Sequence, residues 1–268
     1  EMQHNALSEF QPDVFWNLLQ VKHLDFHRNS LTSLGSKSLM NLPLLEELRI
    51  HSQNNPLQKI VHDAWSGIGQ NLKYLYISQN SLISFPHAVF CPESYPRLLR
   101  IHADYNQISN STEFGLESFH ASELWLYEKQ RQNCAPFSSY PILTHMFLND
   151  NRLRHVFNTD FCEMESLVYL YLQNNDIIDV KLYSTDSPCL PVLLELYLRN
   201  NEIEIIEAEQ TNRSQLRSLQ YLDLGINRLQ YIPDSMKRSD VFPAIRTLLL
   251  DSNLVTFLTT GTFFNLST

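Results

Sequence analysis

An asparagine recurs along this chain at nearly constant intervals, and each copy closes the same short pattern of aliphatic residues. In one of the clearest copies, Leu193, Leu196, Leu198, Asn201 and Ile203 follow the order L-x-x-L-x-L-x-x-N-x-I. A period of 22 to 27 residues predicts a solenoid in which each repeat forms one coil, about eleven coils in all. The Asn position is filled in turn by Asn5, Asn29, Gln53, Asn80, Asn106, Lys129, Asn151, Asn175, Asn201, Asn227 and Asn253.

The alternating aliphatic residues predict a short strand in each coil, and strands of successive coils are expected to pair into a parallel sheet. We expect each Asn amide to turn inward and to satisfy backbone groups of its own and the neighbouring turn. The fold class predicted is therefore an α/β-type solenoid. It is a horseshoe with a concave parallel β-sheet and a mostly irregular or short-helical convex side.

Aromatic or leucine residues recur between the strands, where the chain returns along the outer face. They form F-x-x-L pairs, and we predict that they pack the convex half of the core. The pairs are Phe15 with Leu18, Leu39 with Leu42, Trp65 with Ile68, and Phe263 with Leu266, and Phe90, Phe119 and Phe161 occupy comparable stretches.

The long repeat with F-x-x-L return segments resembles the extracellular typical class of leucine-rich repeats found in Toll-like receptors, chaoptin and Slit. The stretch from Trp65 to Leu75, WSGIGQNLKYL, looks most like the chaoptin variety. The resemblance implies a recognition ectodomain that is secreted or on the cell surface. It does not identify a ligand, because ligands in this class vary with the concave side chains.

With 43% hydrophobic residues and no Pro- or Gly-rich linker, residues 1–268 are predicted to form a single solenoid domain. Both ends fall inside a repeat, so we expect a solenoid that is truncated at both ends and lacks caps. No apolar run approaches the about 20 residues of a membrane helix. Any contact with a membrane is therefore expected only through segments absent from this chain.

Glycosylation sequons and cysteines both favour an extracellular location. Asn110, Asn212 and Asn265 each begin an N-x-S/T sequon that is predicted to lie outside the strands. The four cysteines lie in return segments rather than in leucine positions, which favours disulfide pairing; free buried thiols are the alternative. They are Cys91, Cys134, Cys162 and Cys189.

Cys162 and Cys189 occupy nearly the same place in adjacent coils, so their separation is expected to suit a disulfide. Cys91 with Cys134 would then form the second pair, although it has to reach across an intervening coil. Cys134 with Cys162 is a competing pair.

The residues between the inward leucines are expected to face the concave side of the sheet. The central column reads Asp25, Arg49, Tyr76, His102, Trp125, Phe147, Tyr171, Tyr197, Asp223 and Leu249, and the flanking columns add Tyr74, Arg100, Tyr105, Tyr127, His145, Tyr169 and Tyr221. A contiguous aromatic stripe of this kind predicts a protein-binding surface, because Tyr, Trp and Arg dominate interface energetics. Cross-strand packing that stabilises the sheet, or a homodimer formed through the same face, would also account for it.

The predicted ligand-binding residues are Tyr74, Tyr76, Arg100, His102, Trp125, Tyr127, His145, Phe147, Tyr169, Tyr171 and Tyr197. The coil with Lys129 in place of Asn lies beside Trp125, so it forms either a local projection or a simple irregularity.

Nothing in the sequence favours an enzyme, a cofactor or a bound metal. No G-x-S-x-G, H-E-x-x-H or phosphate loop occurs. The glutamates at 202, 204, 207 and 209 lack the oxygen-rich loop of a calcium site, and a solvated flank is favoured. The net charge of −9 argues against general nucleic-acid binding.

The favoured partner is a protein ligand or co-receptor on the concave face. Two functions follow from the resemblance. One is a cell-surface receptor ectodomain for adhesion, guidance or neuronal patterning. The other is a Toll-type pattern-recognition receptor ectodomain in innate immunity.

Overall fold

The computed structural model falls into two compact units, Glu1–Leu143 and Thr144–Thr268, and each is considered by itself. The residues described are 1–11, 13–54, 56–65, 67–83, 97–109, 142–156, 161, 164–181, 190–207, 216–232, 242–258 and 262–263.

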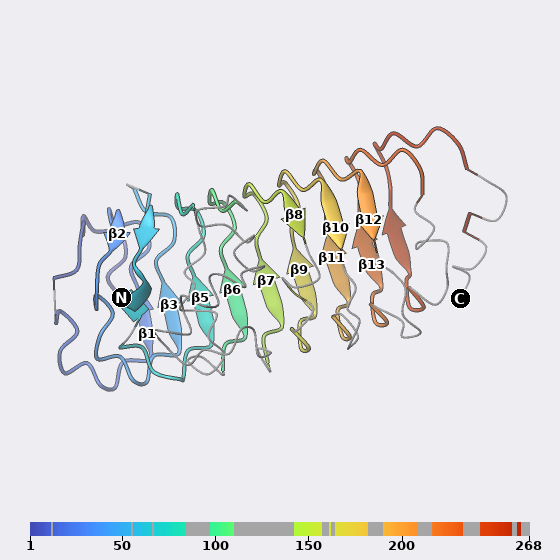
Figure 1. Cartoon of the computed structure of the whole chain (residues 1–268). Coiled ribbons are helices and arrows are strands. Elements are labelled where there is room, and N and C mark those ends of the chain that lie inside the picture. Colours follow the sequence, from blue (N-terminus) through green and yellow to red (C-terminus); the bar gives the residue numbers. More distant parts are fainter. Residues whose placement is uncertain are drawn as a thin grey trace, which may run out of the picture. The chain divides into compact units, whose positions relative to one another are not determined.

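The first unit contains a parallel sheet of short strands that follow one another in chain order (Figure 1). The strands are β1 (His23–Asp25), β3 (Glu47–Arg49), β5 (Tyr74–Tyr76) and β6 (Arg100–His102). Equivalent repeat positions pair across the sheet, as in Leu24 with Leu48 and Leu48 with Leu75. The repeat alignment thus predicted the strand register correctly.

The second unit contains a parallel sheet of the same kind (Figure 1). Its strands are β7 (His145–Phe147), β9 (Tyr169–Tyr171), β11 (Glu195–Tyr197), β13 (Tyr221–Asp223) and β14 (Thr247–Leu249). Each strand pairs with the next in the register that the repeat predicts. The structure confirms the parallel solenoid.

Further short strands follow the Asn turns and were not predicted from the sequence. In the first unit β2 (Ser33–Leu34) pairs with β4 (Lys59–Ile60), which the 3-10 helix η1 (His62–Trp65) follows. In the second unit β10 (Asp179–Lys181) pairs with both β8 (His155–Val156) and β12 (Ile205–Glu207). Two or three residues per strand are too few to produce a recognisable alternation of polar and apolar residues.

The core is built from the middle residue of each concave strand together with the aliphatic residues on either side of the strand. Leu248 is only half-buried, but the other middle residues are buried. These are Leu24, Leu48, Leu75, Ile101, Met146, Leu170, Leu196 and Leu222. Since side chains alternate along a strand, the first and third residues must face the opposite side.

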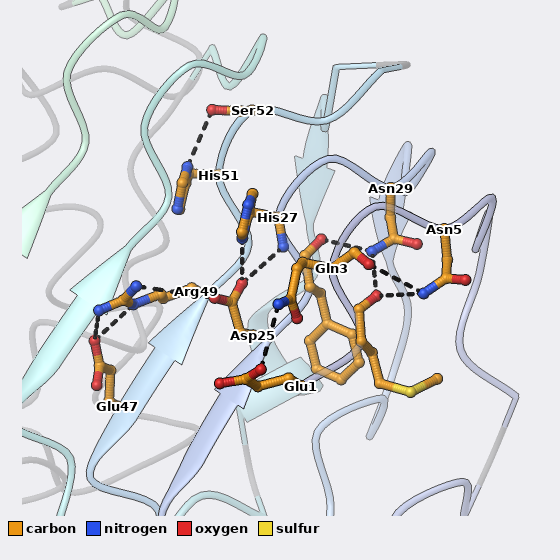
Figure 2. A network of polar contacts seen from close by, with 12 residues as sticks. Glu1, Gln3, Asn5, Asp25, His27, Asn29, Glu47, Arg49, His51 and Ser52 are labelled. Atoms are coloured by element: carbon orange, nitrogen blue, oxygen red, sulfur yellow. Dashed lines mark hydrogen bonds and ion pairs between the residues drawn. The ribbon is translucent and has the colours of Figure 1, made fainter.

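The Asn column binds the backbone of adjacent coils, as predicted. The Asn80 amide donates to the carbonyls of Ile77, in its own coil, at 3.0 Å and of Ile50, in the preceding coil, at 2.9 Å, and its Oδ1 accepts from the Leu57 N–H at 3.1 Å. Gln53 reaches the preceding coil in the same way through Phe26 and Leu31. Figure 2 shows the equivalent amide contacts of Asn29. Buried backbone groups therefore find partners without a regular helix.

The predicted convex core is confirmed for Phe15, Leu39, Leu42, Trp65, Ile68 and Phe161, which are all buried. The prediction is wrong for Leu18, which is 37% exposed, and for Phe263, which is 41% exposed. Both lie near the ends of the described residues. Leu266, Phe90 and Phe119 lie outside the described residues.

Two glycines of the stretch WSGIGQ allow close contact between coils. A Cβ added at Gly67 would lie 2.1 Å from Met40 Cα, and one at Gly69 would lie 2.0 Å from the Pro43 carbonyl oxygen. The Leu42 N–H donates to the Gly67 carbonyl at 2.9 Å, and the Gly69 N–H donates to the Leu42 carbonyl at 3.1 Å. These glycines pack adjacent coils together. This packing agrees with a turn in the stretch WSGIGQ and not with a nucleotide-binding loop.

Candidate ligand-binding surface

We define the concave face of each unit as the side of its sheet that carries the first and third residues of the strands. Of the predicted ligand-binding residues, the structure places Tyr74, Tyr76, Arg100 and His102 on this face in the first unit. In the second unit it places His145, Phe147, Tyr169, Tyr171 and Tyr197 there. Trp125 and Tyr127 lie outside the described residues.

Tyr105 belongs to the turn after β6 and not to a concave strand. Its φ is 53°, a left-handed conformation that recurs immediately before the Asn in the described coils, and its side chain is 52% exposed. Tyr105 therefore lies in a turn. The sequence alignment had placed it in a flanking column of the concave strands.

Arg49 is the third residue of β3 and lies on the concave face of the first unit, beside Glu47 and Asp25 (Figure 2). Its guanidinium donates from Nε to Glu47 Oε1 at 2.7 Å, and its Nη1 lies 3.8 Å from Asp25 Oδ2. The Arg49 Cζ also lies 5.1 Å from the centroid of the Tyr76 ring, a cation–π contact. The Arg49 guanidinium thus contacts two carboxylates and one aromatic ring.

Stacked histidines lie beside this cluster. The His27 and His51 rings are parallel, with centroids 5.0 Å apart and planes at 1°. His27 Nδ1 lies 2.7 Å from Asp25 Oδ1. Burial lowers the pKa of His51, and the nearby His27 lowers it further. Burial raises the pKa of Asp25, but its hydrogen bonds with His27 outweigh burial, and the pKa lies below its ordinary value.

The concave face of the second unit is a stack of aromatic rings. Phe147 and Tyr171 stack with centroids 4.4 Å apart and planes at 5°, and Tyr171 and Tyr197 stack at 4.7 Å and 11°. Tyr221 continues the row at 5.0 Å from Tyr197 with planes at 39°. Because the faces of these rings cover one another, the stack presents ring edges and phenol groups.

Glu195 lies among these tyrosines. The Tyr197 hydroxyl donates to Glu195 Oε2 at 2.6 Å. Burial raises the pKa of Tyr171, and the Glu195 charge raises it further. Burial and the hydrogen bond to Glu195 raise the pKa of Tyr197 well above its ordinary value. The Glu195 charge therefore acts on both tyrosines.

Arg199 pairs with two carboxylates just beyond the stack. Its Nη1 donates to Asp223 Oδ1 at 3.3 Å, and its Nη2 donates to Asp251 Oδ2 at 2.6 Å. A Cβ at Gly225 would lie 2.1 Å from Arg199 Nη1, so the guanidinium occupies space that only glycine leaves open. Asp223, predicted to be exposed on the central column, is in fact buried, with 6% of its surface accessible.

Among the described residues, the predicted aromatic residues that lie on the concave strands are half-buried in both units and not fully exposed as expected. Ring stacking across neighbouring strands explains the difference, because strands of a sheet lie about 4.8 Å apart and the rings fill that spacing. Cross-strand packing, the alternative for this stripe, is therefore present. It leaves ring edges and hydroxyls on the surface.

A family model described as leucine rich repeat matches residues 1–55 and 135–177. The chain has the fold of a leucine-rich repeat solenoid. Among curated relatives it is 27% identical to chicken (Gallus gallus) Keratocan over 170 residues, which covers 61% of this chain and 45% of Keratocan. It is 28% identical to human Podocan-like protein 1 over 246 residues, which covers 82% of this chain and 42% of that protein. The chain therefore spans less than half the length of these relatives.

Solved structures of leucine-rich repeat receptors share this fold. The Toll–Spatzle complex of Drosophila contains a chain that matches with a TM-score of 0.70 at 17% identity, over 95% of this chain and 31% of that one. A TDR receptor matches with a TM-score of 0.63 at 18% identity, over 94% of this chain and 38% of that one. At this identity the likeness establishes the fold.

The concave column two residues before each Asn was not considered in the sequence analysis. It contains His27, His51, Arg199 and Asp251, which form the histidine stack and the arginine cluster. The same alignment of repeats would have found them, because each column of a solenoid sheet places residues of successive coils side by side.

The remaining predicted sites are the cysteines, the glycosylation sequons and the acidic stretch. Cys91, Cys134, Cys162 and Cys189 and the sequon residues Asn110, Asn212 and Asn265 all lie outside the described residues. Glu202, from the acidic stretch, pairs with Arg228 Nη2 at 2.9 Å. Within the described part of the chain, no helix is long and apolar enough to cross a membrane.

Proposed function

We propose that this chain is the ligand-binding leucine-rich repeat region of an extracellular protein, and that a protein partner binds its concave face. The observation that carries the proposal is the aromatic stack of the second unit, Phe147, Tyr171 and Tyr197. These rings fix one another through contacts of 4.4 and 4.7 Å, so they lose little conformational freedom when a partner binds. Rigid aromatic side chains of this kind are typical centres of protein interfaces.

The first unit contributes a more polar surface. Tyr74, Tyr76, Arg100 and His102 remain predicted contacts there, and Trp125 and Tyr127 remain predicted contacts outside the described residues. Tyrosine and arginine are both enriched in protein interfaces, so this surface is also a candidate contact of the partner.

The finer role we propose is adhesion, guidance or neuronal patterning at the cell surface. A Toll-type ectodomain in innate immunity is the second candidate, and the fold shared with the Toll chain of the Toll–Spatzle complex favours it. A Toll–interleukin homology domain in the full-length protein would decide for the second candidate.

The extracellular location has its own test. Mass spectrometry after glycosidase treatment of protein from a secretory host should find glycan on Asn110 and Asn212. Non-reducing peptide mapping should find Cys162 joined to Cys189. Unmodified sequons together with four free thiols would contradict an extracellular location and favour an intracellular scaffold.

The binding proposal is tested by screening the glycosylated chain against an array of purified extracellular proteins, and by measuring each hit with Trp125→Ala and Tyr171→Ala. Loss of a central aromatic contact should weaken binding by about 30-fold, or about 2 kcal/mol. Partners that bind both variants as tightly as wild type would exclude the concave face and direct attention to the convex loops, the lateral edges and the segment from Lys129 to Asn133.

A further inference from the structure

Two glutamates occupy the same column of the concave face and have different neighbours. Glu47 is the first residue of β3, and Glu195 is the first residue of β11. Two residues further along, on the same face, the first unit has Arg49 and the second unit has Tyr197. The equivalent carboxylates therefore meet a cation in one unit and a phenol in the other.

The first unit shows how this face holds a guanidinium. Arg49 Nη2 lies 2.6 Å from Glu47 Oε1, and Arg49 Cζ lies 5.1 Å from the centroid of the Tyr76 ring. A carboxylate at the first strand position, drawn with Arg49 in Figure 2, and a tyrosine at the third position of the next strand together hold one basic group. Both contacts are favourable for a planar cation.

Glu195 repeats the carboxylate of that arrangement, but its aromatic neighbours occupy other positions, because the residue equivalent to Tyr76 is Asp223. In register it pairs with Tyr169 on one side and with Tyr221 on the other, and it accepts the Tyr197 hydroxyl at 2.6 Å. Within the described residues no lysine or arginine forms an ion pair with Glu195. Arg199, at the end of the same coil's strand, is committed to Asp223 and Asp251.

The surrounding charge also favours a basic ligand. On and shortly after β11, β13 and β14, Glu195, Asp223 and Asp251 are opposed by Arg199, while Arg246 directly precedes β14; the whole chain has a net charge of −9. Complementary charge accelerates association and selects partners. A second copy of this chain, itself acidic, is a poorer match than a basic partner.

We propose that the concave face of the second unit binds an arginine or lysine side chain of its protein partner, which pairs with Glu195 between Tyr169 and Tyr221. This site rests on the proposed function and specifies the partner: a basic segment reaches the tyrosine stack. Its cation makes the carboxylate contact that Arg49 makes with Glu47, and it lies against tyrosines of the two neighbouring strands.

The test uses a random 12-residue peptide library selected against the folded chain, followed by affinity measurements on synthetic peptides. Selected peptides should share an arginine or lysine, and replacing it with glutamine should weaken binding to wild type at least 10-fold. Against Glu195→Gln, which keeps the shape of the side chain and an acceptor for the Tyr197 hydroxyl, the same replacement should cost less than 2-fold. Glu47→Gln is the matched control and should behave as wild type.

The outcomes separate this site from the proposed function. Peptides without a shared basic residue, or with one whose replacement costs the same against Glu195→Gln as against wild type, would overturn the site. If such peptides still lose binding with Tyr171→Ala, the concave face stands and only the basic contact fails. If Tyr171→Ala changes nothing, the proposed function fails as well. Thermal unfolding of each variant shows that the fold is intact.

Discussion

The two units share one repeat but differ in how their concave faces satisfy charge and aromatic surface. In the first unit Arg49 neutralises Glu47 and Asp25 and lies over Tyr76, so the charges are paired within the chain. In the second unit Tyr171 stacks on both neighbours, and Glu195 receives only a phenol hydrogen bond among the described residues. The same backbone thus supports a surface whose charges are internally paired and a surface suited to a partner.

This difference shows that side-chain type at a column position, and not the fold, decides what a solenoid face can bind. A leucine-rich repeat fixes the strand spacing and the side on which each residue lies. Whether a carboxylate has a cation from its own strand depends on one residue, Arg49 or Tyr197. Function therefore varies among repeats that have the same architecture.

The largest effect is expected from the core, which serves as the reference for the concave variants. Phe161 is 2% exposed, so Phe161→Ala should lower the free energy of unfolding by about 3 to 5 kcal/mol, the usual cost of removing a buried ring. Urea denaturation followed by circular dichroism measures the change. A loss below about 1 kcal/mol would show that this ring does not pack the convex core.

A smaller effect is expected when the stack is broken. Tyr171→Ala removes two stacked contacts and should lower the free energy of unfolding by about 1 to 3 kcal/mol, since each aromatic pair contributes about 0.5 to 1.5 kcal/mol. Tyr76→Ala is the control in the first unit, because Tyr76 has one stacked ring, His102, at 4.6 Å. An equal or larger loss for Tyr76→Ala would break the distinction between the two faces.

Removing the internal cation of the first unit should have a modest effect. Arg49 is partly exposed, so Arg49→Gln should cost at most about 1 kcal/mol after solvent screening, and the cost should shrink in 1 M salt. Thermal unfolding at low and high salt measures it. A loss that is the same at both salt concentrations would show that Arg49 acts through packing and not through charge.

The smallest effect concerns pH. Burial lowers the pKa of His51 from 6.5, so the unfolded state binds the proton more readily than the folded state. The contribution of neutral His51 to the free energy of unfolding is fully present above pH 6.5. It is lost as the pH falls from 6.5 through the lower pKa of the folded state. His51→Gln should flatten the pH dependence of the melting temperature between pH 7 and 5 relative to wild type. Identical profiles for wild type and His51→Gln would refute this assignment.

Much of the fold could be predicted from the sequence, because the repeat constrains each position many times over. The parallel strands, their register and the bonds of the Asn column all follow from one pattern. The short strands such as β8 and β10 could not be predicted, since two or three residues show no periodicity. The exposure of Leu18 also escaped prediction, because it depends on which neighbouring coils are present.

The concave site could be predicted only in part. The alignment placed Tyr171 and Tyr197 on one face, but it could not show that their rings stack at 4.7 Å and hide their faces. Nor could it show that Arg199 bridges Asp223 and Asp251, because that contact also needs the space left by Gly225. Side-chain packing between columns is not contained in a one-dimensional repeat pattern.

The central claim is that the aromatic stack of the second unit carries partner binding. The most direct test measures the affinity of one partner, found in the extracellular array, for wild type, Tyr171→Ala and Tyr76→Ala at one salt concentration. We expect Tyr171→Ala to weaken binding by about 30-fold and Tyr76→Ala by less than about 3-fold, because the proposed aromatic contact belongs to the second unit. Equal losses for both variants, or no loss for Tyr171→Ala with an intact fold, would contradict the claim.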